Sequence, residues 1–195
     1  MSELDADNGA GFPRDAMLAS VAPARESPDA AAFRHIFETL FDDLVRYAER
    51  RVPESAVDDV VADTFLVAWR RFDELPNAPS DARAWLFAVA RRVLANTHRG
   101  RRRTQAVAVR IASQPHHGGQ DDAAAVAHRV DLARAFERLT SRDQEALALV
   151  AWDGLTPTEA ARVLEISASA FSVRLSRARR RLREHLEPAS SEGAF

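Results

Sequence analysis

The strongest constraint on this chain lies in residues 155–186, which predict two helices joined by a tight turn. Thr156 is a suitable N-cap, and Pro157 follows at the first helical position, where its missing N–H costs nothing. Glu159 stands three residues after the cap, where a capping box places an acidic residue. The first of the two helices is therefore predicted to begin at a well-defined residue.

The second helix of this pair is amphipathic and basic. After a turn at Glu165-Ile166, Ser167 can cap it, and its apolar residues follow one helical face: Phe171, Leu175, Ala178, Leu182 and Leu186. Its other faces carry arginines, and no acidic residue occurs from Ile166 to Arg183. A short capped helix followed by a basic helix is the layout of a DNA-reading helix-turn-helix. An arginine-rich amphipathic helix can also be a solvated face alone, and both interpretations stay open at this point.

Charge is unevenly distributed along the chain, although the formal net charge is only −2. Residues 81–103 contain seven arginines and one aspartate, and residues 161–195 contain seven arginines and four acidic residues. Residues 1–80 contain eight arginines and 16 acidic residues. Two basic segments on an acidic chain indicate two contacts with a polyanion and a separate acidic surface for another partner.

Hydrophobic periodicity predicts an all-α chain of two small helical domains joined by a flexible linker. The predicted helices are 31–51, 54–72, 82–101, 129–139, a helix that starts after Thr140 and ends at Gly154, and the pair described above. Ser55 is predicted to cap the second helix, and residues 73–81 form a loop rich in turn residues. The predicted order is a flexible tail (1–30), a first domain (31–103), a linker (104–128), a second domain (129–187) and a short tail (188–195).

Several classes of protein are disfavoured by what the sequence lacks. The chain has no cysteine, which excludes disulfides and suits a reducing cytoplasm. No apolar run approaches the roughly 18–20 residues of a membrane span, and the N-terminus does not follow a secretory pattern. No nucleophile–base pair, phosphate loop or metal-ligand spacing stands out. We therefore expect a cytoplasmic protein that is not an enzyme, needs no cofactor and does not insert into a membrane.

Three stretches in this order resemble the extracytoplasmic-function (ECF) group of bacterial RNA polymerase sigma factors, within the sigma-70 family. They are Asp58–Arg70, Ala84–Arg92 and Gly154–Arg179. The resemblance covers about residues 32–103 and 130–187. It implies a region 2-like first domain and a region 4-like second domain, with core RNA polymerase and promoter DNA as partners. It also implies an anti-sigma protein that covers both DNA-binding units.

The resemblance assigns roles to the first domain. Its acidic helix would dock on the clamp helices of the largest polymerase subunit through Asp58, Asp59 and Asp63. Carboxylates at a helix start are also stabilised by the positive helix end, which is a sufficient structural explanation. The loop 73–81 and the helix that follows would capture unstacked bases of the −10 element, with four candidate residues: Asn77, Trp85, Arg91 and Asn96. Trp85 can equally be a core residue.

The second domain would place its recognition helix, residues 168–183, in the major groove over the −35 element. The residues early enough to reach bases are Ser169, Ser172, Arg174 and Ser176. The residues expected to hold phosphates are Arg177, Arg179, Arg180 and Arg181, because phosphate contacts position a protein while base contacts specify the sequence. The linker would pass near the RNA exit path of the polymerase.

The sequence departs from the family pattern at several positions. Family members usually have Gly where Glu165 stands, and a left-handed Glu there costs about 1 kcal/mol. Arg92 replaces a common Asn, and Asn96 replaces a common Asp. Apolar or small residues replace the usual polar ones early in the recognition helix: Ala170, Phe171, Ser172 and Val173. The base preferences of other family members therefore do not transfer to this chain.

Two functions compete on this evidence. A promoter-specificity subunit of RNA polymerase gives both domains a role. A dimeric helix-turn-helix regulator explains residues 140–186 and leaves the acidic helix and the first basic helix without a purpose.

Overall fold

The computed structural model describes residues 28–100 and 123–186, and these fold entirely into helices and short connections. The first unit contains α2 (Pro28–Glu49), η1 (Glu54–Ala56), α3 (Val57–Arg70), η2 (Phe72–Glu74) and α4 (Pro79–Gly100). The second unit contains α5 (Ala123–Glu137), α6 (Ser141–Ala151), α7 (Pro157–Val163) and α8 (Ala168–Leu186). The predicted all-α fold is confirmed. Most of the predicted linker, nearly all of the N-terminal tail and the C-terminal tail lie outside the described residues.

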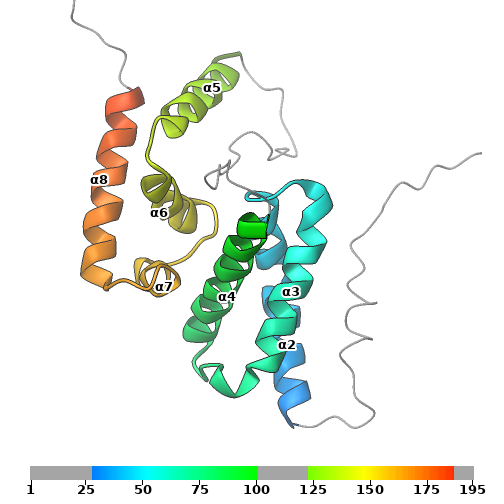
Figure 1. Cartoon of the computed structure of the whole chain (residues 1–195). Coiled ribbons are helices and arrows are strands. Elements are labelled where there is room, and N and C mark those ends of the chain that lie inside the picture. Colours follow the sequence, from blue (N-terminus) through cyan, green and yellow to red (C-terminus); the bar gives the residue numbers. More distant parts are fainter. Residues whose placement is uncertain (1–27, 101–122, 187–195) are drawn as a thin grey trace, which may run out of the picture.

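In the first unit, α3 packs against both α2 and α4 (Figure 1). Four phenylalanines form the centre of the α2–α3 contact, and the rings of Phe37 and Phe65 are 4.6 Å apart. Phe33, Phe37 and Phe41 recur every four residues along α2, so they share one face of that helix. This packing turns the opposite face of α3 toward solvent.

In the second unit, α8 packs against α5, α6 and α7. The predicted apolar stripe of α8 supplies the contact, with Phe171, Leu175 and Ala178 buried. The capping box of α7 is confirmed: Glu159 N–H donates to Thr156 Oγ1 (3.3 Å), and Thr156 N–H donates to Glu159 Oε2 (2.7 Å). Helix α6 ends at Ala151, three residues before the predicted stop at Gly154, which has a left-handed φ of 63° in the connection to α7.

Some helix starts differ from the prediction. Ser55 does not cap α3, because it lies within the 3₁₀ turn η1 and the N-cap is Ala56, which makes no side-chain cap. Helix α4 begins at Pro79, three residues before the predicted start at residue 82, because proline suits the first turn of a helix. Helix α5 begins at Ala123, inside the predicted linker, because this alanine-rich segment favours helix.

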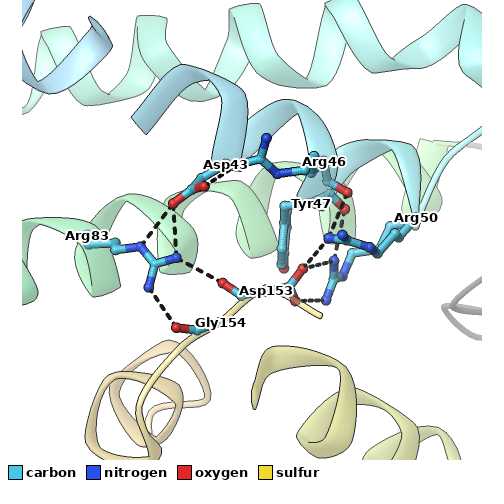
Figure 2. A network of polar contacts seen from close by, with 8 residues as sticks. Asp43, Arg46, Tyr47, Arg50, Arg83, Asp153 and Gly154 are labelled. Atoms are coloured by element: carbon cyan, nitrogen blue, oxygen red, sulfur yellow. Dashed lines mark hydrogen bonds and ion pairs between the residues drawn. The ribbon is translucent and has the colours of Figure 1, made fainter. Parts of the chain in front are cut away.

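The two units lie against each other. Helix α4 packs beside α7 (Figure 1), and the buried apolar residues of both units form one continuous cluster. The C-terminal end of α2 meets the connection between α6 and α7 (Figure 2). The sequence predicts two units and gives no sign of this contact. Among the described helices, none has both the length and the apolar content needed to cross a membrane.

Candidate polymerase and nucleic-acid interfaces

The acidic face of α3 consists of Asp58, Asp59 and Asp63, which are all exposed. Asp58 and Asp59 lie in the first turn, where the positive end of the helix stabilises them. Leu66 follows Asp63 by three residues on the same side and is 45% exposed. Within the described residues, none of the three aspartates forms an ion pair, and no group of three His, Cys, Asp or Glu residues is arranged to hold a metal ion. This surface combines three carboxylates with an exposed apolar side chain.

A cavity of about 390 Å³ lies where the connection before α4 meets α4 and α7. Trp85 lines it and is half-buried, and the Arg71 guanidinium lies 5.9 Å from the centre of its ring. Trp85 also packs against the core, as the core interpretation expects, and its role toward the −10 element stays a prediction. Asn77 is exposed in the connection beside the cavity. An aromatic wall with nearby guanidinium donors can accept an unstacked base.

The other two −10 candidates lie on different sides of α4. Asn96 lies 11 residues after Trp85, on the same helical face, and is exposed. Arg91 points toward the second unit, where its Nε donates to Glu145 Oε1 (2.7 Å), and this hydrogen bond raises the pKa of Arg91. Arg92, which was not among the candidates, lines the cavity in its place. The spacing of Trp85 and Arg92, seven residues apart, is the signal that would have identified it.

Helix α8 presents a long exposed face, which we name the outer face of α8. It holds Ser169, Ser172, Val173, Ser176 and Arg180, which follow the spacing of one helical side and are all exposed. Arg177 and Arg179 are exposed beside it. Phe171 is completely buried and takes no part in this surface. Val173 is 50% exposed and stands among the serines, a placement the sequence analysis did not single out.

The remaining two arginine candidates lie closer to the buried side of α8. Arg174 is half-buried. Arg181 Nη1 donates to Asp143 Oδ2 of α6 (2.6 Å), a contact within the second unit. Arg180 also has a neighbour, Glu184, at 3.4 Å on its own helix. Of the predicted phosphate-binding arginines, Arg180 and Arg181 thus have acidic partners. No ion pair of Arg177 or Arg179 is found within the described residues.

The turn between α7 and α8 contains the departure predicted to be strained. Glu165 has φ 56°, so it does adopt the left-handed conformation. Glu165 N–H donates to the Arg162 carbonyl and Ile166 N–H to the Ala161 carbonyl, which is a Schellman arrangement. The Glu165 carboxylate accepts from Arg92 Nε (3.1 Å) and Nη2 (2.6 Å). Two positions that depart from the family pattern therefore contact each other.

A buried polar network joins α2 to the α6–α7 connection (Figure 2). Arg51 Nη2 donates to Asp153 Oδ2 (2.5 Å), and Arg50 Nη1 donates to Asp153 Oδ1 (3.1 Å). Arg83 of α4 donates to the carbonyls of Asp153 (2.9 Å) and Gly154 (3.1 Å). The Arg51 guanidinium lies 3.6 Å from the centre of the Tyr47 ring, and burial raises the pKa of Tyr47 to about 12.

Two family models match the chain. The model for sigma-70 region 2 matches residues 36–104, and the model for sigma-70 region 4 matches residues 129–182. The first range contains the acidic face of α3 and Trp85, and the second contains α8 through Leu182; the cavity is lined by residues of both ranges. The two matches occur in the order expected from the sequence.

Curated relatives and solved structures agree with these matches. RNA polymerase sigma factor CnrH of Cupriavidus metallidurans is 36% identical over 152 residues, which cover 72% of this chain and 78% of CnrH. ECF RNA polymerase sigma factor SigL of Mycobacterium tuberculosis is 31% identical over 170 residues, which cover 84% of this chain and 96% of SigL. The structure of CnrH in complex with the cytosolic domain of CnrY superposes with a TM-score of 0.56 at 28% identity, covering 90% of this chain and 97% of CnrH.

A further structure supports the fold alone. Sigma factor RpoE of Bartonella quintana, in complex with the anti-sigma factor NepR, matches with a TM-score of 0.60 at 24% identity, over 80% of this chain and 96% of that one. The two family models and the curated relatives lead to one assignment. The chain belongs to the extracytoplasmic-function group of the sigma-70 family of RNA polymerase sigma factors.

Proposed function

We propose that this sigma factor uses three different surfaces, one for the core polymerase and one for each promoter element. The acidic face of α3 binds the core polymerase, the first-unit surface around Trp85 receives the −10 strand, and the outer face of α8 reads the −35 element. The observation that supports the proposal is the position of the residues that form these surfaces: Asp58, Asp59, Asp63 and Trp85 lie within the region 2 match, and the outer face of α8 lies within the region 4 match. The protein acts in the cytoplasm with its polymerase and has no catalytic activity of its own.

Binding of the core polymerase rests on charge and on exposure. Asp58, Asp59 and Asp63 have no ionic partner within the described residues, so their charges are available to a basic partner surface. Leu66 beside them is 45% exposed and offers an apolar contact. A basic surface with a central apolar pocket on the polymerase would complement both features.

Capture of the −10 strand rests on the cavity. Trp85 offers a ring on which a base can stack, and Arg71 and Arg92 offer donors for phosphate or base oxygens. Stacking of one base on an aromatic side chain contributes about 1–3 kcal/mol, which helps to offset the unstacking of the duplex. Asn77 and Asn96 extend the same surface toward neighbouring nucleotides. This arrangement favours a single strand over a duplex.

Recognition of the −35 element rests on the outer face of α8. Arg177, Arg179 and Arg180 hold phosphates, and Ser169, Ser172 and Ser176 face the bases. Val173 adds an apolar contact, which suits the methyl group of thymine. Arg174, which is half-buried, and Arg181, which is exposed but paired with Asp143, act at the edge of the interface.

An anti-sigma protein is a further proposed partner. CnrH and RpoE were each solved with a bound partner, CnrY and NepR respectively. This chain exposes apolar side chains on α5 and α8 that such a protein can cover, among them Val126, Val130 and Leu186.

Run-off transcription tests the proposed function. The purified chain is added to bacterial core polymerase that lacks its own sigma factor, over a library of promoter fragments. Start sites that require the added chain support the proposal and reveal both promoter elements. Retained duplex binding without initiation or association with core would instead favour the dimeric regulator.

A further inference from the structure

One buried carboxylate joins the N-terminal end of α6 to α8. Asp143 lies in the first turn of α6, and its side chain is 5% exposed. Its Oδ2 accepts from Thr140 Oγ1 (2.9 Å) and from Arg181 Nη1 of α8 (2.6 Å). The Asp143 N–H donates in turn to Thr140 Oγ1 (3.2 Å), which makes Thr140 the N-cap of α6. The carboxylate that binds Arg181 is therefore itself held in place within α6.

Arg181 differs in its surroundings from the arginines of the outer face of α8. It follows Arg180 by one residue, which places it about 100° farther around the helix. Its ion pair crosses to another helix, whereas the pair of Arg180 with Glu184 (3.4 Å) stays within α8. A pair between two helices can fix how one is placed against the other, which a pair inside a single helix cannot do.

The apolar packing of α8 weakens toward its C-terminal end, where Arg181 lies. Phe171 and Ala178 are completely buried, Leu182 is half-buried and Leu186 is 39% exposed. Hydrophobic contact is non-directional, so it holds α8 to the rest of the unit without fixing its rotation. A charge-assisted hydrogen bond is strong and has a preferred direction. The bond from Arg181 thus adds a direction where the apolar contact fades.

We propose that Arg181 is a positioning residue for −35 recognition: through Asp143 it fixes the rotation of α8 about its axis, and it does not hold a DNA phosphate. This inference rests on the proposed function of the outer face of α8. A helix with its side chains has a radius of about 5–6 Å, so a rotation of about 20° moves the ends of Ser172 and Ser176 by about 2 Å. Such a shift breaks a hydrogen bond to a base edge. Loss of the pair should therefore reduce sequence preference more than total affinity.

The sign of one charge change separates the two possible roles of Arg181. Asp143→Asn removes a negative charge beside α8 and frees Arg181, so a phosphate-binding Arg181 would raise the affinity for every duplex. A positioning Arg181 predicts a loss of preference. The ratio of affinities for a duplex with the −35 element and one of scrambled order should fall by about fivefold or more, the size of one weak base contact. The full chain is titrated by fluorescence anisotropy, with the −35 element taken from promoters mapped by run-off transcription.

Glu184→Gln is the matched control, because it also removes one carboxylate and frees one arginine of α8. Its pair with Arg180 lies within a single helix, so the variant should raise the affinity for both duplexes and keep their ratio. Thermal unfolding of every variant is measured in parallel.

Three changes at Arg181 complete the test. Arg181→Gln should lower the ratio as Asp143→Asn does, and the double variant should lower it no further, because both remove the same contact. The double variant leaves the net charge unchanged, so its slope of log affinity against log salt should equal that of the parent chain. Arg181→Lys keeps a charged donor for the single bond to Asp143 and should restore most of the ratio.

The outcomes distinguish this inference from the proposed function. An Asp143→Asn chain that gains affinity and keeps its ratio, as Glu184→Gln does, would overturn the inference and return Arg181 to phosphate binding. A loss of ratio that Arg181→Gln does not share would also contradict it, because Asp143 would then act through Thr140 alone. Arg181→Gln changes an exposed side chain, so it decides the question even if Asp143→Asn unfolds. A parent chain that binds both duplexes equally contradicts the proposed function of α8, and this inference falls with it.

Discussion

At the scale of single residues, Tyr47 makes the contact between the units measurable, because it is the chain's one tyrosine. Burial raises its pKa from 10.0 to about 12. Between these values the unfolded chain has lost the phenolic proton while the folded chain retains it, so stability falls as pH rises. We expect full stability from this group below pH 10 and a loss of about 2 kcal/mol by pH 12. Urea unfolding monitored with tyrosinate absorbance measures both quantities.

The amino-acid composition removes the side chains that would otherwise titrate in the same pH range as Tyr47. The chain contains neither lysine nor cysteine, so no other side chain ordinarily titrates between about pH 9 and 12. Tyr47→Phe is the control and should abolish the slope in this range. Tyrosinate absorbance that rises near pH 10 in the folded protein would contradict the prediction.

Glu165 combines a backbone cost with an ionic contact. Its φ of 56° costs about 1 kcal/mol for a residue with a Cβ, and glycine removes this cost. The half-exposed pair with Arg92 contributes about 0.2–1 kcal/mol. We therefore expect Glu165→Gly to leave the free energy of unfolding unchanged or to raise it by up to about 1 kcal/mol, while it loosens the contact between units.

A second variant separates the two effects. Arg92→Gln breaks the same ion pair and keeps the strained backbone, so it should lower the free energy of unfolding slightly. Chemical unfolding of both variants and of the double variant gives the comparison. A Glu165→Gly protein less stable than Arg92→Gln would show that the left-handed turn is not strained.

At the scale of elements, the outer face of α8 separates phosphate binding from base reading. Arg177→Ala with Arg180→Ala should weaken duplex binding at every sequence and reduce the slope of log affinity against log salt by about 2, since each phosphate contact contributes about 0.9. Val173→Ala is the contrasting change, expected to alter preference at one base position with an unchanged slope. Anisotropy titrations at several salt concentrations measure both. A loss confined to one base position in the arginine variant would contradict the phosphate assignment.

The acidic face of α3 supports a prediction about core polymerase. Asp59→Arg with Asp63→Arg reverses two exposed charges that lie one turn apart, so association with core should weaken by about tenfold or more. Duplex binding by α8 should be unchanged. Asp42→Arg reverses one exposed charge on α2 and should have no effect on association; it is compared with Asp59→Arg and Asp63→Arg made singly, by co-migration with core. Equal losses in Asp42→Arg and in these single variants would indicate a general effect of charge.

Local features of these elements could be predicted from the sequence, and distant pairings could not. The capping box of Thr156 and Glu159, the buried stripe through Phe171 and the left-handed residue 165 each depend on neighbours within a few positions. The Arg51–Asp153 pair joins residues 102 positions apart, and no periodicity marks such a partner. For the same reason Arg91 was predicted to face DNA, although its closest partner here is Glu145. Arg92 could have been identified from its spacing along α4, because it lies seven residues after Trp85 and therefore on the same helical face.

At the scale of the whole molecule, the closed arrangement conflicts with simultaneous use of both DNA-binding surfaces. The −10 and −35 elements are about 25 base pairs apart, or about 85 Å at 3.4 Å per base pair. Two units whose helices α4 and α7 pack together cannot reach both sites (Figure 1). Initiation therefore requires an open chain, and the apparent affinity for productive complexes is reduced by the fraction that is open.

Asp153→Asn should change that fraction in transcription itself. Removal of this charge leaves Arg51 buried without a counter-ion in the closed chain, which destabilises closure by about 3–5 kcal/mol. We expect the sigma concentration that gives half-maximal run-off transcript to fall by about threefold or more, with the plateau unchanged, because saturating core already selects open molecules. Titration of the variant, the parent and Asp42→Asn at fixed core concentration provides the measurement. Half-maximal concentrations that agree between the variant and the parent would show that closure does not limit initiation and that another step controls entry into the productive complex.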